Sequence, residues 1–128
     1  MIVIDQIVEY PAAMTTDKGL PGTRWSHLFS TLAGPEGERE LLAFAERIGL
    51  YWRWIQKPGK PNVHFDCTPY MRKKAVLAGA LTVQSRLYAR AKLAGPEALA
   101  TYLAAPEHIR LDIQPPAPLL SYTEFELG

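Results

Sequence analysis

The chain alternates short strand-like runs with helix signals, and this order constrains its fold more than any other feature. Residues 2–5 form an apolar run that ends in an acid, which is typical of a buried strand. Within residues 38–48, apolar side chains recur at helical spacing from Leu41 to Ile48, and Gly49 then ends the pattern. The repeated exchange of strand and helix signals predicts an α/β fold in which a small mixed sheet packs against helices.

Three further helix starts are indicated by residues that favour a first turn. Thr68 is a good N-cap and is followed by Pro69, which suits the first helical position. Ser85 can cap a helix in the same way, and Pro96 opens another. We expect helices at residues 69–78, 86–94 and 96–104. In the first of them we expect Met71, Ala75 and Ala78 to face the core.

Aromatic content, alternation and turn residues assign the remaining segments. We expect strands at residues 51–55, 62–67, 81–83 and 109–113, a strand or helical turn at 24–29, a mobile loop at 11–23, a turn at 58–61 and an extended stretch at 114–118. A strand at 51–55 would place Trp52 and Trp54 on one face, which we assign to the core. The sequence divides into an α/β core domain, residues 1–94, and a C-terminal helix and proline-containing extension, residues 95–128.

The net charge of +1 hides an asymmetry along the 128 residues. Residues 51–94 hold nine basic side chains and one acid, whereas residues 95–128 hold five acids and one base. A local excess of positive charge favours an anionic partner, which could be a phosphorylated, nucleotide-like small molecule or a nucleic acid. The alternative is a solvated helix face, with the acidic tail folded back on the basic centre.

Cysteine usage and hydropathy bear on the compartment. The single cysteine, Cys67, excludes an internal disulfide framework and suits a reducing environment. No apolar run approaches the roughly 20 residues that span a bilayer, and residues 1–5 lack the basic flank of a signal peptide. These features predict a cytoplasmic protein without a membrane partner. Self-association through the last residues is a further expectation.

His64 and Asp66 lie two residues apart in a predicted strand, so their side chains share one face. Together with His27 they provide the two imidazoles and one carboxylate of a facial metal-binding triad. The same groups suit general acid–base chemistry at a phosphoester, because histidine exchanges protons near neutral pH. The structural alternative is that Asp66 only fixes the tautomer of His64. The sequence names neither a metal nor a cofactor.

Other residues are candidates for holding a ligand. Ser85 and Arg86 stand where a strand gives way to a helix, and Arg72 is a second guanidinium that could clamp a phosphate. Capping alone is the alternative role for Ser85. Trp25 precedes His27 and is our candidate for stacking on a ring, with its neighbour Arg24 beside it.

Several of these residues carry a resemblance to a known family. The tryptophan and histidine at 25 and 27, the helix at 40–50, His64-Phe65-Asp66 and Val83-x-Ser85-Arg86 resemble domain of unknown function 4031 over about residues 1–94. That family is a short domain found in bacteria and their phages. The resemblance implies an α/β domain with a recurrent polar set, namely Trp25, His27, His64, Asp66, Ser85 and Arg86. It implies no activity, and Phe65 stands here where the family has a tyrosine.

Three functions follow from these residues. The leading hypothesis is that a His/Asp/Arg pocket binds a nucleotide-like ligand, to sequester or process a nucleotide signal. The second is a phosphodiester hydrolase or nuclease that uses His27, His64 and Asp66. The third is a protein-interaction module without catalysis.

Overall fold

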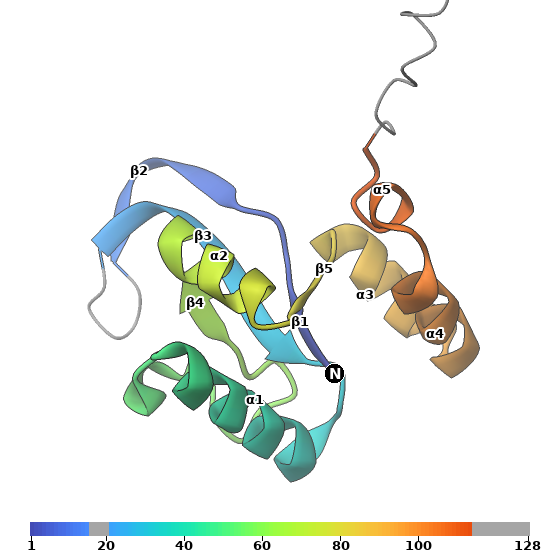
Figure 1. Cartoon of the computed structure of the whole chain (residues 1–128), viewed down its shortest axis with the longest axis horizontal. Helices are drawn as coiled ribbons and strands as arrows, with labels where there is room; N and C mark the ends of the chain where they lie inside the picture. The colour runs from blue at the N-terminus through green and yellow to red at the C-terminus, as the bar shows by residue number, and fades with distance from the viewer. Residues whose placement is uncertain (16–20, 114–128) are drawn as a thin grey trace, which may run out of the picture.

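The computed structural model describes residues 1–15 and 21–113 (Figure 1). The predicted α/β fold with a small mixed sheet is confirmed in this part of the chain. The elements in chain order are β1 (Ile2–Ile4), β2 (Val8–Thr15), β3 (Pro21–Ser30), α1 (Gly34–Ile48), the 3-10 helix η1 (Trp52–Trp54), β4 (Phe65–Cys67), α2 (Pro69–Leu77), β5 (Leu81–Thr82), α3 (Ser85–Ala94), α4 (Pro96–Ala104) and α5 (Glu107–Arg110).

The long strand β3 organises the sheet, because β1, β2 and β4 all pair with it in antiparallel fashion. Leu28 pairs with Ile4 of β1 and with Phe65 of β4, so these two strands flank β3 on opposite edges. β5 adds to β1 in parallel, which makes the sheet mixed. The polar residue His27 of β3 is thereby held opposite Asp66 of β4.

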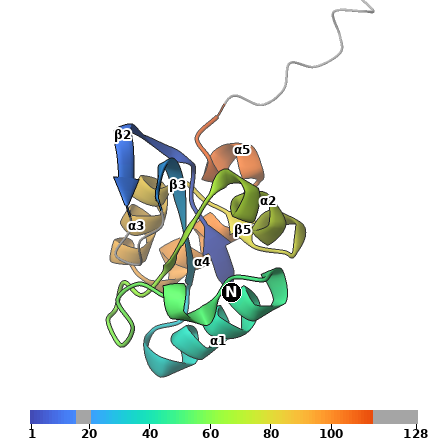
Figure 2. The same cartoon turned by 90° about the vertical axis from the view of Figure 1, so that its left-hand side faces the viewer.

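Side chains alternate between the two faces of the sheet, and each face has its own core. Ile2 and Ile4 belong to the larger apolar cluster, to which α1 and α2 contribute. Val3 belongs to a smaller cluster with Val83 and Tyr88, against which side chains of α4 pack. Figure 2 shows α2 and α3 on opposite sides of β3. The sheet is therefore covered by helices on both faces, and His27 shares the face of Val3 and Phe29 by alternation along the strands.

The helix signals of the sequence are largely confirmed. α1 contains the expected amphipathic stretch, and Gly49 ends it with φ of 84°, a conformation that suits glycine. Thr68 caps α2 by accepting a hydrogen bond from the backbone N–H of Met71. Ala75 is buried as predicted, whereas Ala78 lies beyond the end of α2 and is exposed, so its predicted inward position is wrong.

Ser85 does not cap α3, contrary to the prediction. The side chain of Gln84 accepts from the backbone N–H of Leu87 and takes the capping role. Ser85 is the first residue of the helix, and its hydroxyl accepts a hydrogen bond from Gln6 Nε2 instead. A glutamine has the length to fold back on the first turn, and this leaves the serine free to tie α3 to Gln6 in the break between β1 and β2.

Two predicted strands are helical turns. Residues 51–55 contain η1, where the N–H groups of Trp54 and Ile55 bond to carbonyls three residues earlier instead of to a neighbouring strand. Trp52 is 58% exposed, so its assignment to the core is wrong. The predicted strand at residues 109–113 is also wrong, because the helix α5 covers Glu107–Arg110. Of the predicted strand 62–67, only Phe65–Cys67 is regular, with His64 in an isolated bridge to Gln56.

The predicted loop at residues 11–23 is also wrong where the structure describes it. β2 and β3 run through residues 11–15 and 21–23 as an antiparallel pair. Their register shifts between Glu9 and Met14, and an irregular stretch of this kind accommodates Pro11 in a strand. The tip at 16–20 and the predicted extended stretch at 114–118 lie outside the described residues.

No helix in residues 1–15 and 21–113 is long and apolar enough to cross a membrane. After residue 94, side chains of α4 such as Leu99 and Leu103 pack on the smaller apolar cluster. The division into a core of 1–94 and an extension of 95–128 stays a prediction.

Candidate functional site

A break between β1 and β2 brings a carboxylate to β3. Asp5 lies just after Ile4, where regular strand pairing stops, and its side chain is buried. The backbone N–H of Asp5 donates to the carbonyl of His27 at 3.1 Å. In return, the backbone N–H of His27 donates to Asp5 Oδ1 at 2.6 Å. The carboxylate thus takes the place of a backbone carbonyl in the sheet.

The second oxygen of Asp5 orients the imidazole of His27. Asp5 Oδ2 lies 2.7 Å from His27 Nδ1, and we assign a proton to Nδ1 because its partner is a carboxylate. The other ring nitrogen, Nε2, then carries a lone pair in the neutral ring. A carboxylate that accepts from Nδ1 in this way is a common support of a metal-ligating histidine.

β4 presents two more ligand atoms to His27. Asp66 is the cross-strand partner of His27, and its Oδ1 lies 3.8 Å from His27 Nε2. His64 precedes Asp66 by two residues on the same face, as predicted, and its Nε2 lies 3.3 Å from the same oxygen. His64 Nδ1 lies 2.8 Å from the carbonyl oxygen of Asn62, which can only accept. His64 therefore also directs an Nε2 lone pair toward Asp66.

We call His27, His64 and Asp66 the His–Asp cluster. One ligand atom from each lies within 4.8 Å of the other two. Two atoms bonded to one tetrahedral ion at about 2.0–2.2 Å lie roughly 3.3–3.6 Å apart, so the observed 3.3 and 3.8 Å need only a small closure. Three lone-pair donors at this spacing repel one another unless a cation lies between them. The arrangement suits either a proton or a divalent metal ion.

The electrostatics of the cluster favour a cation. The hydrogen bond from its ring to Asp5 raises the pKa of His27 above its ordinary value of 6.5. Partial burial opposes this shift, while the negative charges of Asp5 and Asp66 add to it. The side chain of His27 is 37% exposed and those of His64 and Asp66 are 19% and 17% exposed, so solvent reaches the cluster from one side. A positive charge on the His27 ring is therefore stabilised.

Cys67 follows Asp66 but takes no part in this chemistry. Its side chain is buried in the larger apolar cluster. Burial raises the pKa of the Cys67 thiol to about 12, so the thiol stays protonated near neutral pH. A nucleophilic or metal-binding thiolate is therefore disfavoured here.

Arg72 is placed next to the residue that orients His27. It extends from the first turns of α2, and its Nε donates to the backbone carbonyl of Asp5 at 3.0 Å. Its terminal guanidinium nitrogens make no hydrogen bond or ion pair within the described residues, and the side chain is half-buried. A guanidinium anchored through Nε retains two terminal nitrogens, with four N–H donors, for an anion.

Ser85 and Arg86 lie at the start of α3, which is tied to the same break in the sheet. The backbone N–H of Ser85 donates to Gln6 Oε1 at 3.0 Å, and Gln6 Nε2 donates to the Ser85 hydroxyl at 2.9 Å. The N–H of Leu87 is also occupied, by Gln84. The helix start thus offers an anion fewer free N–H groups than the sequence suggested. Arg86 is exposed.

Arg24 and Trp25, which lie shortly before His27, differ in their placement. Arg24 is exposed, and its odd spacing from His27 puts it on the other face of β3. Trp25 shares the face of His27 but is only 4% exposed, so its ring is not available for stacking on a ligand. Trp25 Nε1 is buried without a hydrogen-bond partner among the described residues.

Sequence reasoning missed the supports of the two histidines. The sequence shows Asp5 as an acid at the end of a predicted strand. Its spacing to His27 gives no sign that it orients that ring. The carbonyl of Asn62 and the amide of Gln6 carry no sequence signal at all, because backbone pairing decides which atoms meet. The roles predicted for the His–Asp cluster, Arg72, Ser85 and Arg86 stay predictions.

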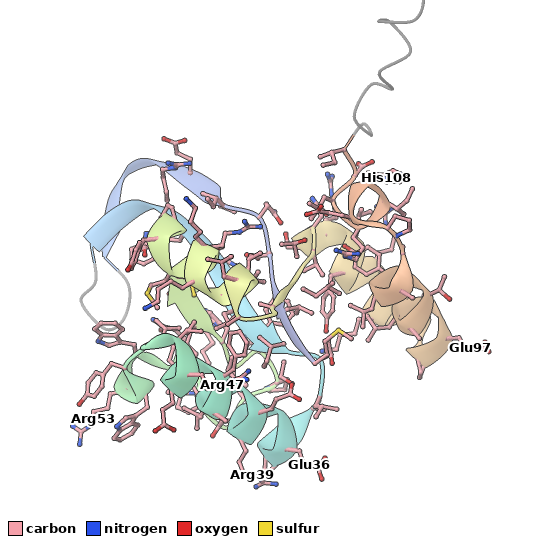
Figure 3. All side chains as sticks on the ribbon, in the orientation of Figure 1. Glu36, Arg39, Arg47, Arg53, Glu97 and His108 are labelled. Carbon is pink, nitrogen blue, oxygen red and sulfur yellow. The ribbon has the colours of Figure 1, made fainter. Side chains whose placement is uncertain are left out.

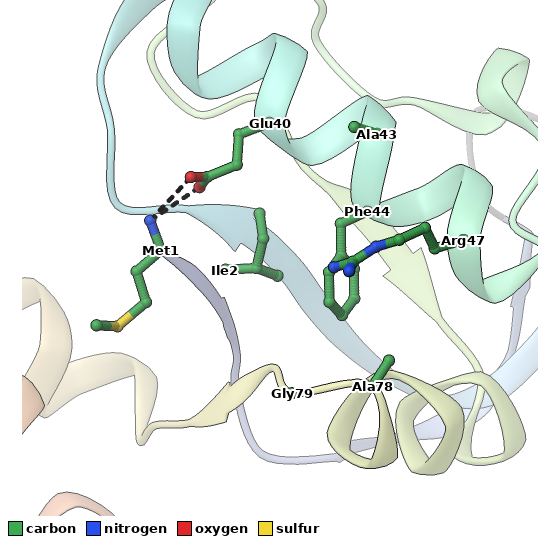
Figure 4. Close-up of a pocket in the computed structure, with 8 residues that line it drawn as sticks. All are labelled: Met1, Ile2, Glu40, Ala43, Phe44, Arg47, Ala78 and Gly79. Carbon is green, nitrogen blue, oxygen red and sulfur yellow. Dashed lines mark hydrogen bonds and ion pairs between the residues drawn. The ribbon is translucent and has the colours of Figure 1, made fainter.

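A shallow hollow away from the cluster has fewer side chains that could bind a metal or transfer a proton. It has a volume of about 390 Å³ and lies between Met1, α1 and the end of α2 (Figure 4). Its main polar contact is the N-terminal ammonium of Met1 at 2.9 Å from Glu40 Oε1. None of its lining residues belongs to the His–Asp cluster. We therefore take the cluster as the candidate site.

Fold and site together define the class: an α/β protein whose sheet carries two oriented imidazoles beside a carboxylate. The chain belongs to the family described as Protein of unknown function (DUF4031), whose model matches residues 13–94. This confirms the resemblance noted from the sequence, and the matched range includes the whole His–Asp cluster but not Asp5. No curated protein and no solved structure matches the chain.

Proposed function

We propose that this protein is a divalent-metal-dependent hydrolase of phosphate esters, with the metal bound by His27 Nε2, His64 Nε2 and Asp66. The observation that carries the proposal is the convergence of three lone-pair donors whose histidines are each fixed through Nδ1. This choice combines our leading sequence hypothesis, a pocket for a phosphorylated ligand, with the hydrolase hypothesis.

The donor set suits a borderline cation that leaves coordination positions open. Two imidazoles and one carboxylate are ligands of zinc, iron, manganese or cobalt, and three protein ligands leave room for water and substrate. A metal ion bound there would lower the pKa of a coordinated water so that its oxygen can attack phosphorus. In such a hydrolysis the water oxygen would bond to phosphorus as the bond to the leaving oxygen breaks, and the proton lost by the water would pass through solvent to the leaving oxygen.

Two basic side chains of the described residues can bind a phosphate. Arg72, fixed to the carbonyl of Asp5, has two terminal nitrogens that can bind two phosphate oxygens at once. Arg86 at the start of α3 is an exposed second cation of the basic middle region. A single buried cysteine also accords with action in the reducing cytoplasm, which we include in the proposal.

Metal binding and turnover test the proposal directly. We would strip the protein with a chelator, add Zn²⁺, Mn²⁺ or Co²⁺, and follow cleavage of bis(p-nitrophenyl) phosphate while calorimetry measures metal affinity. Asp66→Asn and His64→Gln should lose more affinity than the roughly 10- to 100-fold that loss of an orienting partner costs. The matched control is His108→Gln, a histidine outside the cluster. Unchanged affinity in both cluster variants, or an intact substrate with all three metals, would contradict it.

One alternative retains the same site without turnover. If the metal binds as expected and no phosphodiester is cleaved, the cluster and Arg72 would hold a nucleotide phosphate and release it unchanged. A thermal-shift titration with nucleotides, repeated with Arg72→Ala, separates this outcome from hydrolysis.

A further inference from the structure

We propose that the substrate is single-stranded nucleic acid and that an exposed aromatic segment, residues 51–54, binds its bases. This inference rests on the proposed function, because it names the class of phosphate ester that the site takes. The segment comprises Tyr51 and η1, with Arg53 at its centre.

The aromatic side chains of this segment are exposed on a fixed backbone. Tyr51 is 49% and Trp52 is 58% exposed. The turn is closed by the N–H of Trp54, which donates to the carbonyl of Tyr51 at 2.9 Å. Trp54 itself packs on the larger apolar cluster, and the buried Ile55 follows it. Large apolar rings held in solvent by an ordered turn are costly unless a partner covers them.

The rings are arranged for stacking. Tyr51 lies edge-on to both tryptophans, with its ring centre 6.1 Å from that of Trp52 and 5.8 Å from that of Trp54. Arg53 Cζ lies 5.0 Å from the centre of the Trp52 ring. Figure 3 shows Arg53 projecting from the outer edge of the molecule. Aromatic faces interleaved with guanidinium groups are the usual platform for unpaired bases, since every base has a face to stack.

The positive charge around the segment favours a negatively charged polymer as its ligand. Between Ile48 and Phe65 the sequence holds three cations, Arg53, Lys57 and Lys60, and no acid. Both lysines are exposed. One acid, Glu38, contacts this stretch. Its side chain accepts a hydrogen bond from the backbone N–H of Gly59. A protein partner would require only the rings, whereas rings together with unbroken positive charge suit a phosphate backbone.

The backbone of the segment is connected to that of a ligand in the His–Asp cluster. Gln56, two residues after Trp54, pairs with His64 through both backbone hydrogen bonds, at 2.8 and 3.2 Å. Gln56 is 4% exposed, so this connection is part of the buried frame. The segment and His64 therefore hold fixed positions relative to one another.

Anisotropy of a fluorescein-labelled 20-nucleotide oligothymidylate tests the inference, with chelator present so that hydrolysis plays no part. Trp52→Ala should weaken binding by roughly tenfold. The matched control, Tyr70→Ala, removes another exposed aromatic residue, in α2, and should leave binding unchanged. The double variant Lys57→Gln/Lys60→Gln should make the slope of log affinity against log salt shallower by about 0.7 for each lost contact, whereas Lys92→Gln should not.

The outcomes separate this inference from the proposed function. Equal binding by wild type and Trp52→Ala, or equal loss in Tyr70→Ala, would overturn the inference even if bis(p-nitrophenyl) phosphate is cleaved. Loss of a dimer in Trp52→Ala would overturn it too, since the rings would then contact a second copy. Tryptophan-dependent binding that survives in Asp66→Asn supports it. If the wild type shows this binding but cleaves no phosphodiester with any of the three metals, that result counts against the hydrolase alone.

Discussion

At the residue scale, the site depends on which nitrogen of each imidazole carries the proton. Asp5 and the carbonyl of Asn62 settle this for His27 and His64, respectively. Neither support contacts the position between the ligand atoms. Their effect is to direct both Nε2 lone pairs toward Asp66, which a histidine free to change its tautomer would not do reliably.

Asp5→Asn is expected to reverse the tautomer of His27. The amide oxygen would still accept from the backbone N–H of His27, which leaves the amide NH₂ facing Nδ1. The ring would then place its proton on Nε2 and lose its lone pair for the metal. We expect a loss of metal affinity of about 10- to 100-fold, measured by calorimetry with Zn²⁺. Asp112→Asn, an exposed acid in the last described turn, is the control and should bind as the wild type does.

Sequence reasoning at this scale succeeds where a local period decides the outcome. The alternation of a strand is enough to place His64 and Asp66 on one face. The same reasoning misjudged Trp25, because nothing local indicates that the face it shares with His27 is covered at one end and open at the other. It also could not assign the support of His27, since Asp5 reaches that ring through a break in pairing between distant segments.

At the element scale, capping and pairing decide which sequence signals become structure. Thr68 and Pro69 set the start of α2 as expected, and α2 in turn carries Arg72 to the backbone of Asp5. The aromatic run at 51–55 has the composition of a strand, yet its backbone bonds close locally and no strand within residues 1–15 and 21–113 pairs with η1. The five residues at 109–113 are too few for a period of two to exclude a helical turn, and Pro106 accepts the first bonds of α5.

Thr68→Ala should destabilise the protein through α2. The substitution removes the oxygen that accepts from the N–H of Met71, and loss of such a cap costs about 1 kcal/mol. The free energy of unfolding from urea titration would measure this, with Thr68→Ser as the control because serine retains the accepting hydroxyl. A loss of the same size in Thr68→Ser would show that the methyl group, and not the cap, matters.

At the scale of the whole molecule, the two faces of the sheet carry different groups of side chains. The larger apolar cluster fills the face under α1 and α2, and the smaller cluster shares its face with the His–Asp cluster. The fold class follows from the order of elements in the sequence. The hairpin of β2 and β3 does not, because proline and glycine indicate a loop unless an irregular register accommodates them.

Stability should depend on pH through His27. Its pKa is raised in the folded protein, so its protonation stabilises the metal-free fold fully below pH 6.5, the ordinary value. That contribution is lost as the pH rises through the folded pKa, and the free energy of unfolding should fall over this window. Urea titrations at a series of pH values would measure the slope. It should be absent in Asp5→Asn and unchanged in His108→Gln.

The stabilisation that saturating metal gives the folded protein should increase with pH. A metal ion requires the deprotonated imidazole, so the rise in Tm that Zn²⁺ produces should grow as the pH increases through the pKa of His27. A metal-induced rise in Tm that is the same on both sides of that pKa would exclude His27 as a ligand.

The wide spacing of the site along the chain bears on the order in which the molecule assembles. Asp5 and His27 are 22 residues apart, and Arg72 reaches Asp5 across 67. Such distant partners meet only after most of the chain has collapsed, because closing long loops is slow. A nascent polypeptide still lacking β4 would hold His27 without the carboxylate of Asp66, so it should not sequester trace zinc during synthesis. Ion uptake would instead report that folding is complete.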